Sequence, residues 1–258
     1  MGSLMDESTP SPRLPQELID LVIECIPTQD LTTLQACALA STHFRSRAQQ
    51  AIFSDIALRS DNLATMHECF SKSTFAQFVR SLAINAMEIA FDNDIAALLP
   101  VIALLESPRR QDLTNPLASV NASHISSLHI TMLSLPTFLD HLHILFAFPK
   151  LHQLSLVRVR WGTSDPPAEN AFLATVAPLQ LDSLAIRFCA VAPLLNVLCP
   201  AADAAPFRSL RLDHYDFISP VWPQLVQRTG AHLEELEVWP FYGGACTCQT
   251  QIFRDNRT

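Results

Sequence analysis

Residues 14–53 read LPQELIDLVIECIPTQDLTTLQACALASTHFRSRAQQAIF, and this stretch predicts three short helices. Pro15 fits the first turn of a helix, because its ring fixes φ and its missing N–H would have no partner there. A second helix is expected after a cap at Thr28 or Asp30, and a third after a cap at Ser41. A module of about forty residues has too little core to be stable alone. The stretch is therefore expected to bind a partner.

The first predicted helix is apolar around most of its circumference. Its apolar residues are Leu18, Ile19, Leu21, Val22, Ile23, Cys25 and Ile26. Glu17, Asp20 and Glu24 mark a narrow polar side, and Pro27 is expected to end the helix. A surface helix normally has one apolar stripe, which faces its own core. We therefore expect this helix to be covered on two sides, once by its own domain and once by another protein.

The order and spacing of residues in this module resemble an F-box, of the kind found in many proteins of mushroom-forming fungi. The matching residues are Leu14-Pro15-x-Glu17-Leu18, Ile26, Asp30-Leu31, Leu34, Cys37, Leu39, Ser41, Phe44-Arg45 and Ala48-Gln49-x-x-Ile52-Phe53. Phe44 stands where many F-boxes have tryptophan, which is a departure that keeps an aromatic side chain. The alternative is an ordinary helical subdomain that packs on the rest of the chain.

The F-box resemblance implies a partner. It implies docking on the Skp-type adaptor of a cullin–RING ubiquitin ligase. The adaptor contacts that it implies are Leu14, Pro15, Leu18, Ile19, Val22, Leu31, Leu34 and Leu39.

A six-residue unit, apolar-x-x-Leu-x-apolar, recurs through the rest of the chain. The copies are Val79–Ile84, Ile125–Ile130, Leu151–Leu156, Leu181–Ile186, Phe207–Leu212 and Leu233–Val238. Their central leucines are separated by 46, 26, 30, 26 and 26 residues. Such a period predicts a solenoid, in which each unit gives a strand, a turn and a returning helix. The array resembles the irregular leucine-rich repeats that often follow an F-box.

The predicted fold class is therefore α/β, with a three-helix module before a parallel sheet of about six short strands and helices on the outer face. The returning helices are expected at Asp92–Glu106, Pro136–Phe146, Glu169–Ala177, Ala192–Leu198 and Pro220–Arg228. The predicted segments are a disordered tail (1–13), the helical module (14–53), a linker (54–77), the solenoid (78–241) and an irregular tail (242–258). Within the linker we expect a strand at Ile56–Arg59 and a helix at Leu63–Phe75. The tail either caps the array or marks a shortened version of a longer one, and we favour the second.

The alternation of side chains along each strand locates the expected target-binding surface. Every second side chain points to the outer face of the sheet. The early strands present small side chains there. The late strands present charged and aromatic ones: Arg187, Arg211, Asp213, Glu235, Glu237 and Trp239. Arginine and tryptophan are favoured interface residues, so these six are the candidate target-binding residues. The alternative is a set of solvated charges near the end of the array.

Composition excludes several classes of function. The 258 residues carry a net charge of −8, and the longest basic run is Arg109-Arg110, so no nucleic-acid partner is expected. The apolar stretches Ile95–Leu105 and Phe188–Ala202 are short and interrupted by proline, so no membrane partner is expected. Seven cysteines without paired spacing, and acidic residues near the start, favour a reduced protein of the cytoplasm, the nucleus or both.

Catalytic and metal sites are also disfavoured. Five glycines cannot build a dinucleotide fold, a P-loop or a nucleophile elbow. His141 and His143 are two apart on a predicted helix and diverge, so they are not expected to share a metal ion. Cys246 and Cys248 have no second ligand pair at zinc-finger spacing. No enzymatic activity, metal or cofactor is expected.

These patterns lead to a functional hypothesis. The chain is expected to be the substrate-recognition subunit of an SCF-type (Skp–cullin–F-box) ubiquitin ligase, with the adaptor bound by the helices and the target by the repeats. The alternative is an interaction scaffold of the same build that transfers no ubiquitin. A hydrolase or metal enzyme is a third class, which the glycine count and the lack of a ligand cluster disfavour.

Overall fold

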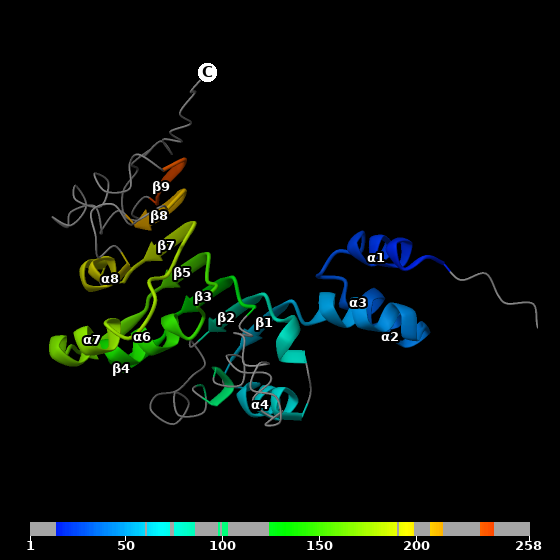
Figure 1. Ribbon diagram of the computed structural model, residues 1–258, viewed down its shortest axis with the longest axis horizontal. Helices are drawn as coiled ribbons and strands as arrows, with labels where there is room; N and C mark the ends of the chain where they lie inside the picture. Colours follow the sequence, from blue (N-terminus) through cyan, green and yellow to red (C-terminus); the bar gives the residue numbers. More distant parts are fainter. Residues whose placement is uncertain are drawn as a thin grey trace, which may run out of the picture. The chain divides into compact units, whose positions relative to one another are not determined.

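The fold is mixed α/β, in a computed structural model that describes residues 14–59, 61–72, 75–85, 98, 100–102, 124–189, 191–198, 207–213 and 233–239. The chain divides into two compact units, residues 1–53 and 54–258, which we call the helical unit and the sheet unit. The helical unit contains α1 (Gln16–Glu24), α2 (Leu31–Ala40) and α3 (Thr42–Ile52). The sheet unit contains the parallel strands and the helices that accompany them (Figure 1).

The three helices of the helical unit begin close to the expected residues. The Asp30 carboxylate caps α2 by accepting a hydrogen bond from the Thr33 N–H at 3.1 Å, and hydrogen bonds from Thr33 lower the pKa of Asp30. Ser41 caps α3 by accepting from the His43 N–H at 3.2 Å. Helix α1 differs slightly from the prediction, because Pro15 precedes its first residue and the helix ends at Glu24. The helix therefore ends before it reaches Pro27, the residue that was expected to end it.

The helical unit has a small core at the meeting of its three helices. Ile23 of α1, Leu34 of α2 and Ala48 of α3 are fully buried there. Partly buried apolar residues surround them: Ile26, Cys37, Ala38, Phe44, Ala51 and Ile52. Burial of a leucine or isoleucine side chain contributes about 1.5–3 kcal/mol. A core of this size holds three helices together but leaves most of their surface outside it.

The main sheet of the sheet unit is open and wholly parallel. Its strands lie in the order β1-β2-β3-β5-β7-β8-β9, so each strand pairs with the strand of the next repeat (Figure 1). Their bounds are β1 Asp55–Leu58, β2 Ser81–Asn85, β3 Ser127–Thr131, β5 Gln153–Val157, β7 Ser183–Arg187, β8 Ser209–Asp213 and β9 Glu235–Trp239. The six predicted strands are confirmed, and they pair in register. The central leucines of the six copies lie opposite one another: Leu82, Leu128, Leu154, Leu184, Leu210 and Leu236.

The sheet has a seventh strand, β1, whose sequence follows the same repeated pattern as the other six. Ile56 of β1 pairs with Leu82, and it lies 26 residues before that leucine. The sequence Phe53-x-x-Ile56-x-Leu58 is therefore a further copy of the unit, with isoleucine at its centre. Residues 54–77 were predicted to be a linker with a strand at Ile56–Arg59 and a helix at Leu63–Phe75. Both elements are confirmed, and the strand, β1, is an edge of the main sheet.

A backbone ladder runs along the amino-terminal edge of the strands. At each step one carbonyl oxygen accepts two N–H groups, one from each of two consecutive residues of the next repeat. The Ser54 oxygen accepts from Arg80 (2.8 Å) and Ser81 (2.9 Å). The same arrangement continues at the carbonyls of Arg80, Ser126, His152, Asp182 and Arg208. These bonds involve the backbone alone, and the buried apolar positions of each strand set the register in which they form.

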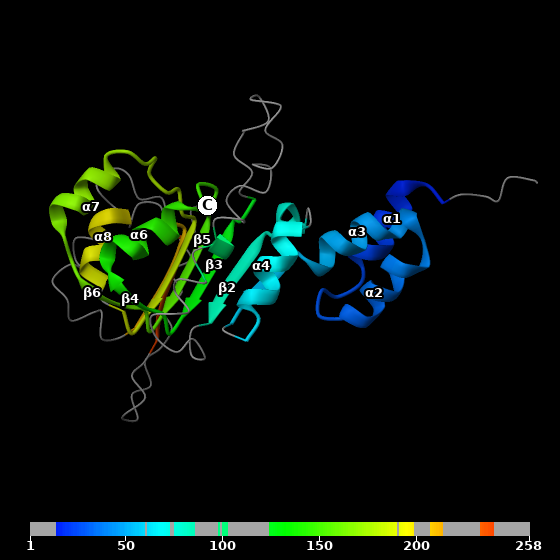
Figure 2. The same cartoon turned by 90° about the horizontal axis from the view of Figure 1, so that it is seen from below.

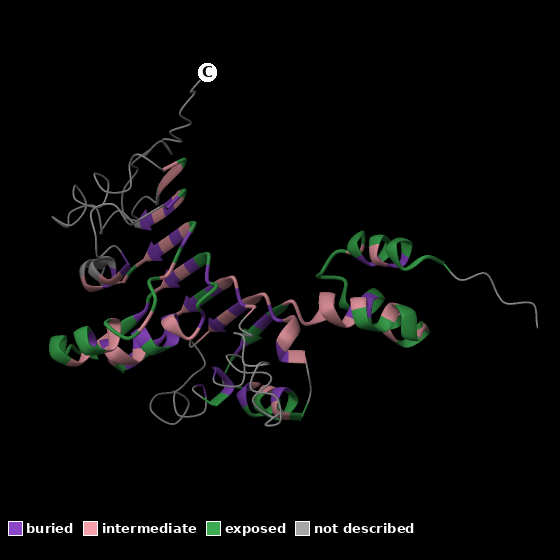
Figure 3. Ribbon diagram, in the orientation of Figure 1, coloured by how far each residue is buried: buried purple, intermediate pink, exposed green. Residues whose placement is uncertain are grey.

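The side chains of the strands alternate between the core and the opposite face (Figure 3). Leucine and isoleucine at the two apolar strand positions are almost fully buried from β2 to β8. The apolar residue three places before each central leucine is buried as well: Val79, Ile125, Leu151, Leu181 and Phe207. The three apolar positions of each unit thus build one continuous core between neighbouring repeats.

The helices of the sheet unit lie on one side of the row of strands (Figures 1 and 2). They are α4 (Leu63–Lys72), the short 3-10 helix η1 (Phe75–Phe78), α6 (Phe138–Phe146), α7 (Pro166–Leu173) and α8 (Val191–Leu198). Three of the predicted returning helices are confirmed within a few residues. Those predicted at Pro220–Arg228 and over most of Asp92–Glu106 fall outside the described residues, as do both predicted tails. No helix in the described part of the chain has both the length and the apolar character needed to cross a bilayer.

A second, two-stranded parallel sheet was not predicted. It joins β4 (Ser134–Thr137) to β6 (Arg160–Thr163), which follow β3 and β5 after a sharp turn. Gly162 comes so close to its neighbour that a Cβ atom there would lie 2.6 Å from the Pro136 carbonyl oxygen. Only glycine fits at this position without movement of the backbone.

His141 of α6 is a polar residue within the apolar core. It is fully buried, and its ring stacks on Trp161 at a centroid distance of 5.2 Å. Neither ring nitrogen has a hydrogen-bond partner in the described structure. Burial lowers the pKa of His141 to about 4, so the imidazole is neutral near pH 7.

We expect Gly162→Ala to destabilise the sheet unit, because the new methyl group would overlap the Pro136 carbonyl oxygen. Overpacking of this kind costs about 1–3 kcal/mol. Chemical denaturation followed by circular dichroism measures the change. Ser134→Ala, at an exposed position of the same small sheet, is the control and should leave the midpoint nearly unchanged. A Gly162→Ala protein as stable as the wild type would contradict the close approach.

We expect stability to fall in acid because of His141. Its pKa is lower in the folded protein than in the unfolded chain, so protonation favours unfolding. The contribution is complete above pH 6.5 and is lost as the pH falls towards 4, by up to about 1.4 kcal/mol per pH unit. His141→Phe should flatten this part of the profile of unfolding free energy against pH.

Candidate functional site

Helix α1 has two apolar faces, and only one of them is covered. Ile19 and Ile23 point into the helical unit and are buried. Since successive residues are about 100° apart on a helix, Leu21 lies opposite the buried pair, and Leu18 and Val22 lie between the two sides. All three are exposed. We call these three residues the outer face of α1. An apolar outer face is the reverse of what an ordinary surface helix shows.

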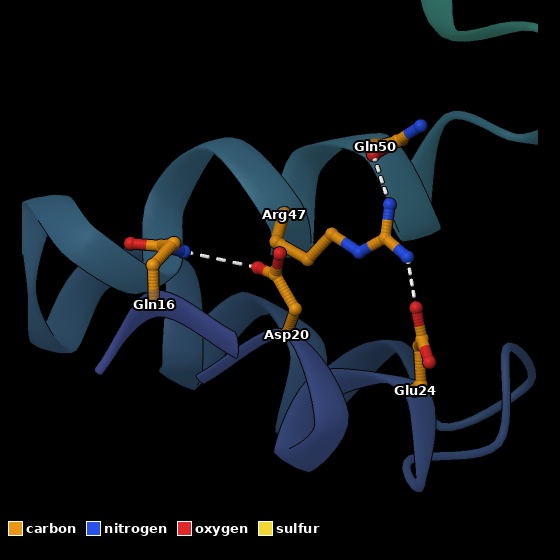
Figure 4. Close-up of polar contacts among 5 residues, drawn as sticks. All are labelled: Gln16, Asp20, Glu24, Arg47 and Gln50. Carbon is orange, nitrogen blue, oxygen red and sulfur yellow. Dashed lines mark hydrogen bonds and ion pairs between the residues drawn. The ribbon is translucent and has the colours of Figure 1, made fainter. Parts of the chain in front are cut away.

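One polar contact joins the polar side of α1 to α3 (Figure 4). The guanidinium of Arg47, on α3, donates to the carboxylate of Glu24, on α1, and to Gln50 on its own helix. Along α1, the side-chain amide of Gln16 donates to Asp20 at 2.9 Å. The polar side of α1 thus adjoins α3, and the outer face is left to solvent.

The predicted adaptor-binding residues divide into two groups. Ile19 and Leu34 have exposed fractions of only 4% and 0%, because their side chains hold the helices of this unit together. In this conformation they offer no surface to a partner. The other six are exposed: Leu14, Pro15, Leu18, Val22, Leu31 and Leu39. Leu39 is the most exposed of these leucines, at 83%.

Leu21 is exposed in the same way but was missing from the predicted set. Leu21 lies beside Leu18 on a helical wheel, and this position could have identified it from the sequence. The candidate docking surface of the helical unit consists of the outer face of α1, Leu14, Pro15, and the exposed leucines of α2.

The late strands of the sheet carry a connected set of charges. The Arg211 guanidinium lies between two carboxylates of the neighbouring strand, 3.3 Å from Glu235 and 3.2 Å from Glu237. The Ser209 hydroxyl donates to Glu235 at 2.6 Å, and this bond, together with Arg211, lowers the pKa of Glu235. The three predicted target-binding residues Arg211, Glu235 and Glu237 therefore come together, with the one positive charge of Arg211 shared between two carboxylates.

The other predicted target-binding residues lie on the same rows of the sheet. Asp213 pairs with Trp239 through the backbone of β8 and β9, and their side chains fall outside what the structure describes. Arg187, at the end of β7, lies beside the ring of Phe188, with its guanidinium carbon 5.5 Å from the ring centroid. Besides Arg187, the set holds one arginine and three carboxylates, so its net charge is negative.

Two residues near Arg187 were not predicted. Phe188 follows β7 and Arg158 follows β5, and both are exposed. The Arg158 guanidinium carbon lies 5.4 Å from the Phe188 ring centroid. Strand alternation could not identify them, because it describes only the residues within a strand. The useful signal was their shared place in the repeat, directly after the last strand residue.

Metal chemistry finds little support in the described part of the chain. No group of three or more potential ligands lies close enough there to hold an ion. The carboxylate of Asp140 accepts hydrogen bonds from the N–H and hydroxyl of Thr137 at the start of α6, while His141 is buried and His143 is exposed. Cys246 and Cys248 fall outside the described residues.

Comparison with known proteins assigns no family. No protein-family model and no curated protein matches the chain. Its function therefore has to be inferred from its residues and their geometry.

Proposed function

We propose that this chain is the substrate-recognition subunit of an SCF-type ubiquitin ligase. In this proposal the helical unit is an F-box that binds a Skp-type adaptor, and the sheet unit is a leucine-rich-repeat solenoid that binds a target protein. The adaptor connects the chain to the cullin and RING subunits. Such a ligase works in the cytoplasm, the nucleus or both.

The observation that carries this proposal is the double apolar character of α1. Its inner face supplies Ile19 and Ile23 to a small core, and its outer face exposes three further apolar residues. Leu31 and Leu39 of α2 are exposed as well. Such apolar exposure in so small a unit is explained by a stable partner, and the F-box-like order of residues indicates which one.

The sheet unit supports the second half of the proposal. Repeat architectures present extended faces to protein partners, and each repeat contributes a few side chains. The chain itself supplies no catalytic group in this scheme. It accelerates ubiquitin transfer by holding target lysines near the charged E2 enzyme, so that a bimolecular encounter becomes an intramolecular one.

Substitution of the exposed leucines should abolish adaptor binding. Leu18→Asp combined with Leu31→Asp places charges on both exposed apolar helices, and each charge would be buried without a partner in a complex. We expect the affinity for a Skp-type adaptor to fall by about 100-fold or more, which corresponds to a loss of about 2.7 kcal/mol. Co-expression and co-purification with the adaptor, followed by calorimetric titration, measure the change.

The matched control is Thr65→Asp combined with His67→Asp, which adds the same charges at exposed positions of α4 in the sheet unit. This variant should bind the adaptor as the wild type does. Equal adaptor binding by the Leu18/Leu31 variant, or no binding by the wild type, would refute the proposal. Circular dichroism of both variants shows whether the helices are retained.

A scaffold without ubiquitin transfer remains the competing function. Reconstitution of the adaptor, cullin, RING subunit and E2 with the full chain distinguishes the two. Ubiquitin transfer to a protein captured by the sheet unit supports the ligase. Stable adaptor binding without any transfer supports the scaffold.

A further inference from the structure

We propose that the outer edge of β1 is a docking surface for the same edge of a second copy of this chain, and that the side chain of Asn62 covers this edge in the monomer. The edge consists of the backbone groups of Asp55, Ala57 and Arg59, and we call it the β1 edge. The inference concerns self-association and does not depend on the proposed ligase function.

The β1 edge is one border of the main sheet. In the described part of the chain, β1 is the first strand of the row and pairs with β2 alone (Figure 1). The Ser54 carbonyl oxygen bonds to the repeat that contains β2, so Ser54 faces that strand. Because the backbone groups of successive strand residues point to opposite sides, those of Asp55, Ala57 and Arg59 point away from β2. Such an edge is a template for a further strand.

The side-chain amide of Asn62 occupies part of the β1 edge as a neighbouring strand would. Its Nδ2 donates to the Ala57 carbonyl oxygen at 2.8 Å. Its Oδ1 accepts from the Arg59 N–H, also at 2.8 Å. A carboxamide carries a donor and an acceptor like those of a peptide group, so one side chain pairs with two groups of the edge. Proteins commonly cover edge strands and thereby prevent their association.

A second copy satisfies the same backbone groups when two β1 edges meet across a two-fold axis, which makes the paired strands antiparallel. With Ala57 opposite the second copy's Ala57, the two residues exchange two N–H···O bonds. The Arg59 N–H of each copy then faces the Asp55 carbonyl oxygen of the other, which adds two more. Every one of these bonds uses either the Ala57 oxygen or the Arg59 N–H. These are the two groups that Asn62 holds in the monomer.

The turn after β1 is compatible with this pairing. The Arg59 carbonyl oxygen accepts from the Asn62 N–H at 3.0 Å and from the Leu63 N–H at 3.1 Å. The four bonds between the copies do not use this oxygen. The side chain of Asn62 can therefore leave the edge while the backbone of the turn and the start of α4 stay in place.

The charges of β1 favour the same register. Asp55 and Arg59 are both exposed, and pairing about Ala57 places each of them opposite the other's counterpart in the second copy. Opposite charges that face one another across two strands stabilise the pair. In the monomer, Asp55 accepts from the Ser54 hydroxyl at 2.8 Å, and the Arg59 guanidinium lies 3.2 Å from Asp61. These local contacts are exposed, so they compete only weakly.

Sedimentation velocity of the full chain over a wide range of concentration tests the proposal. We expect the wild type to dimerise weakly. Asn62→Ala should lower the dimer dissociation constant at least about 10-fold, because two hydrogen bonds no longer compete with the second copy. Asn170→Ala removes an exposed amide from α7 instead and is the matched control, which should sediment as the wild type does.

A charge exchange tests the register. In the Asn62→Ala protein, Asp55→Arg places arginine opposite arginine and should raise the dissociation constant at least about 10-fold. The further change Arg59→Asp restores opposite charges and should recover most of the lost affinity. Ala57→Pro in the same protein removes the central N–H and should abolish the dimer. Recovery by the reciprocal exchange is a result that non-specific aggregation would not give.

Association through the exposed leucines of the helical unit is a separate process. The same series is therefore repeated with Leu18→Asp and Leu31→Asp, and the order of the dissociation constants should be unchanged. A loss of all self-association in this background would assign the dimer to the helical unit and overturn the proposal, whatever the outcome of the adaptor experiment.

The remaining outcomes are also decisive. Asn62→Ala protein that associates no better than the wild type, growth of larger oligomers in place of a closed dimer, or no recovery after the charge exchange would each contradict the proposal. Circular dichroism shows whether the variants keep their fold. If Asn62→Ala does not fold, Asp55→Arg in the otherwise wild-type chain should still weaken the dimer at high concentration, and an unchanged dissociation constant would count against the β1 edge.

Discussion

The sheet depends on the backbone ladder in which one carbonyl oxygen per repeat accepts two N–H groups from the next. It begins at Ser54 and continues at Arg80, Ser126, His152, Asp182 and Arg208. Each bond contributes about 0.5–1.5 kcal/mol on its own. Together they hold every strand in the same register, so the leucines and isoleucines of successive repeats meet in one core. Stability in such an array is a sum of contacts between neighbours, and each repeat depends on the next.

The helical unit differs from the sheet unit, because it exposes apolar residues on its surface as well as burying them in its core. Burial of Ile23, Leu34 and Ala48 accounts for the packing of three helices. It does not account for the apolar outer face of α1, which stays exposed while Ile19 and Ile23 pack inward. In the proposed ligase, an adaptor covers this face. In the sheet unit, neighbouring strands from β2 to β8 bury the apolar positions of one another.

The sequence predicted the sheet well because the repeat is local and periodic. Six strands and their register follow from six leucines. The copy at β1 was missed because isoleucine replaces the central leucine and because Phe53 was assigned to the helical module. The sheet of β4 and β6 was missed because its strands are four residues long and contain Pro136 and Gly162, which are typical of loops.

The candidate site was harder to predict than the fold. The apolar residues of α1 and α2 were identified, but their division into core and surface depends on which helix packs on which. Ile19 and Leu34 consequently entered the predicted surface although they are buried. On the sheet, alternation identified Arg211, Glu235 and Glu237 but gave no sign that their charges are paired.

The left-handed turn after β3, β5 and β7 has a consequence for how specificity can change over evolution. The backbone there is fixed by the repeat, since Met132, Arg158 and Phe188 share one conformation. The side chains differ completely, so the turn accepts a thioether, a guanidinium or an aromatic ring at a similar conformational cost. Mutations at these positions can therefore alter the edge of the sheet while the core and the ladder stay the same. Such a separation of variable from conserved positions would let one scaffold acquire new targets by single substitutions.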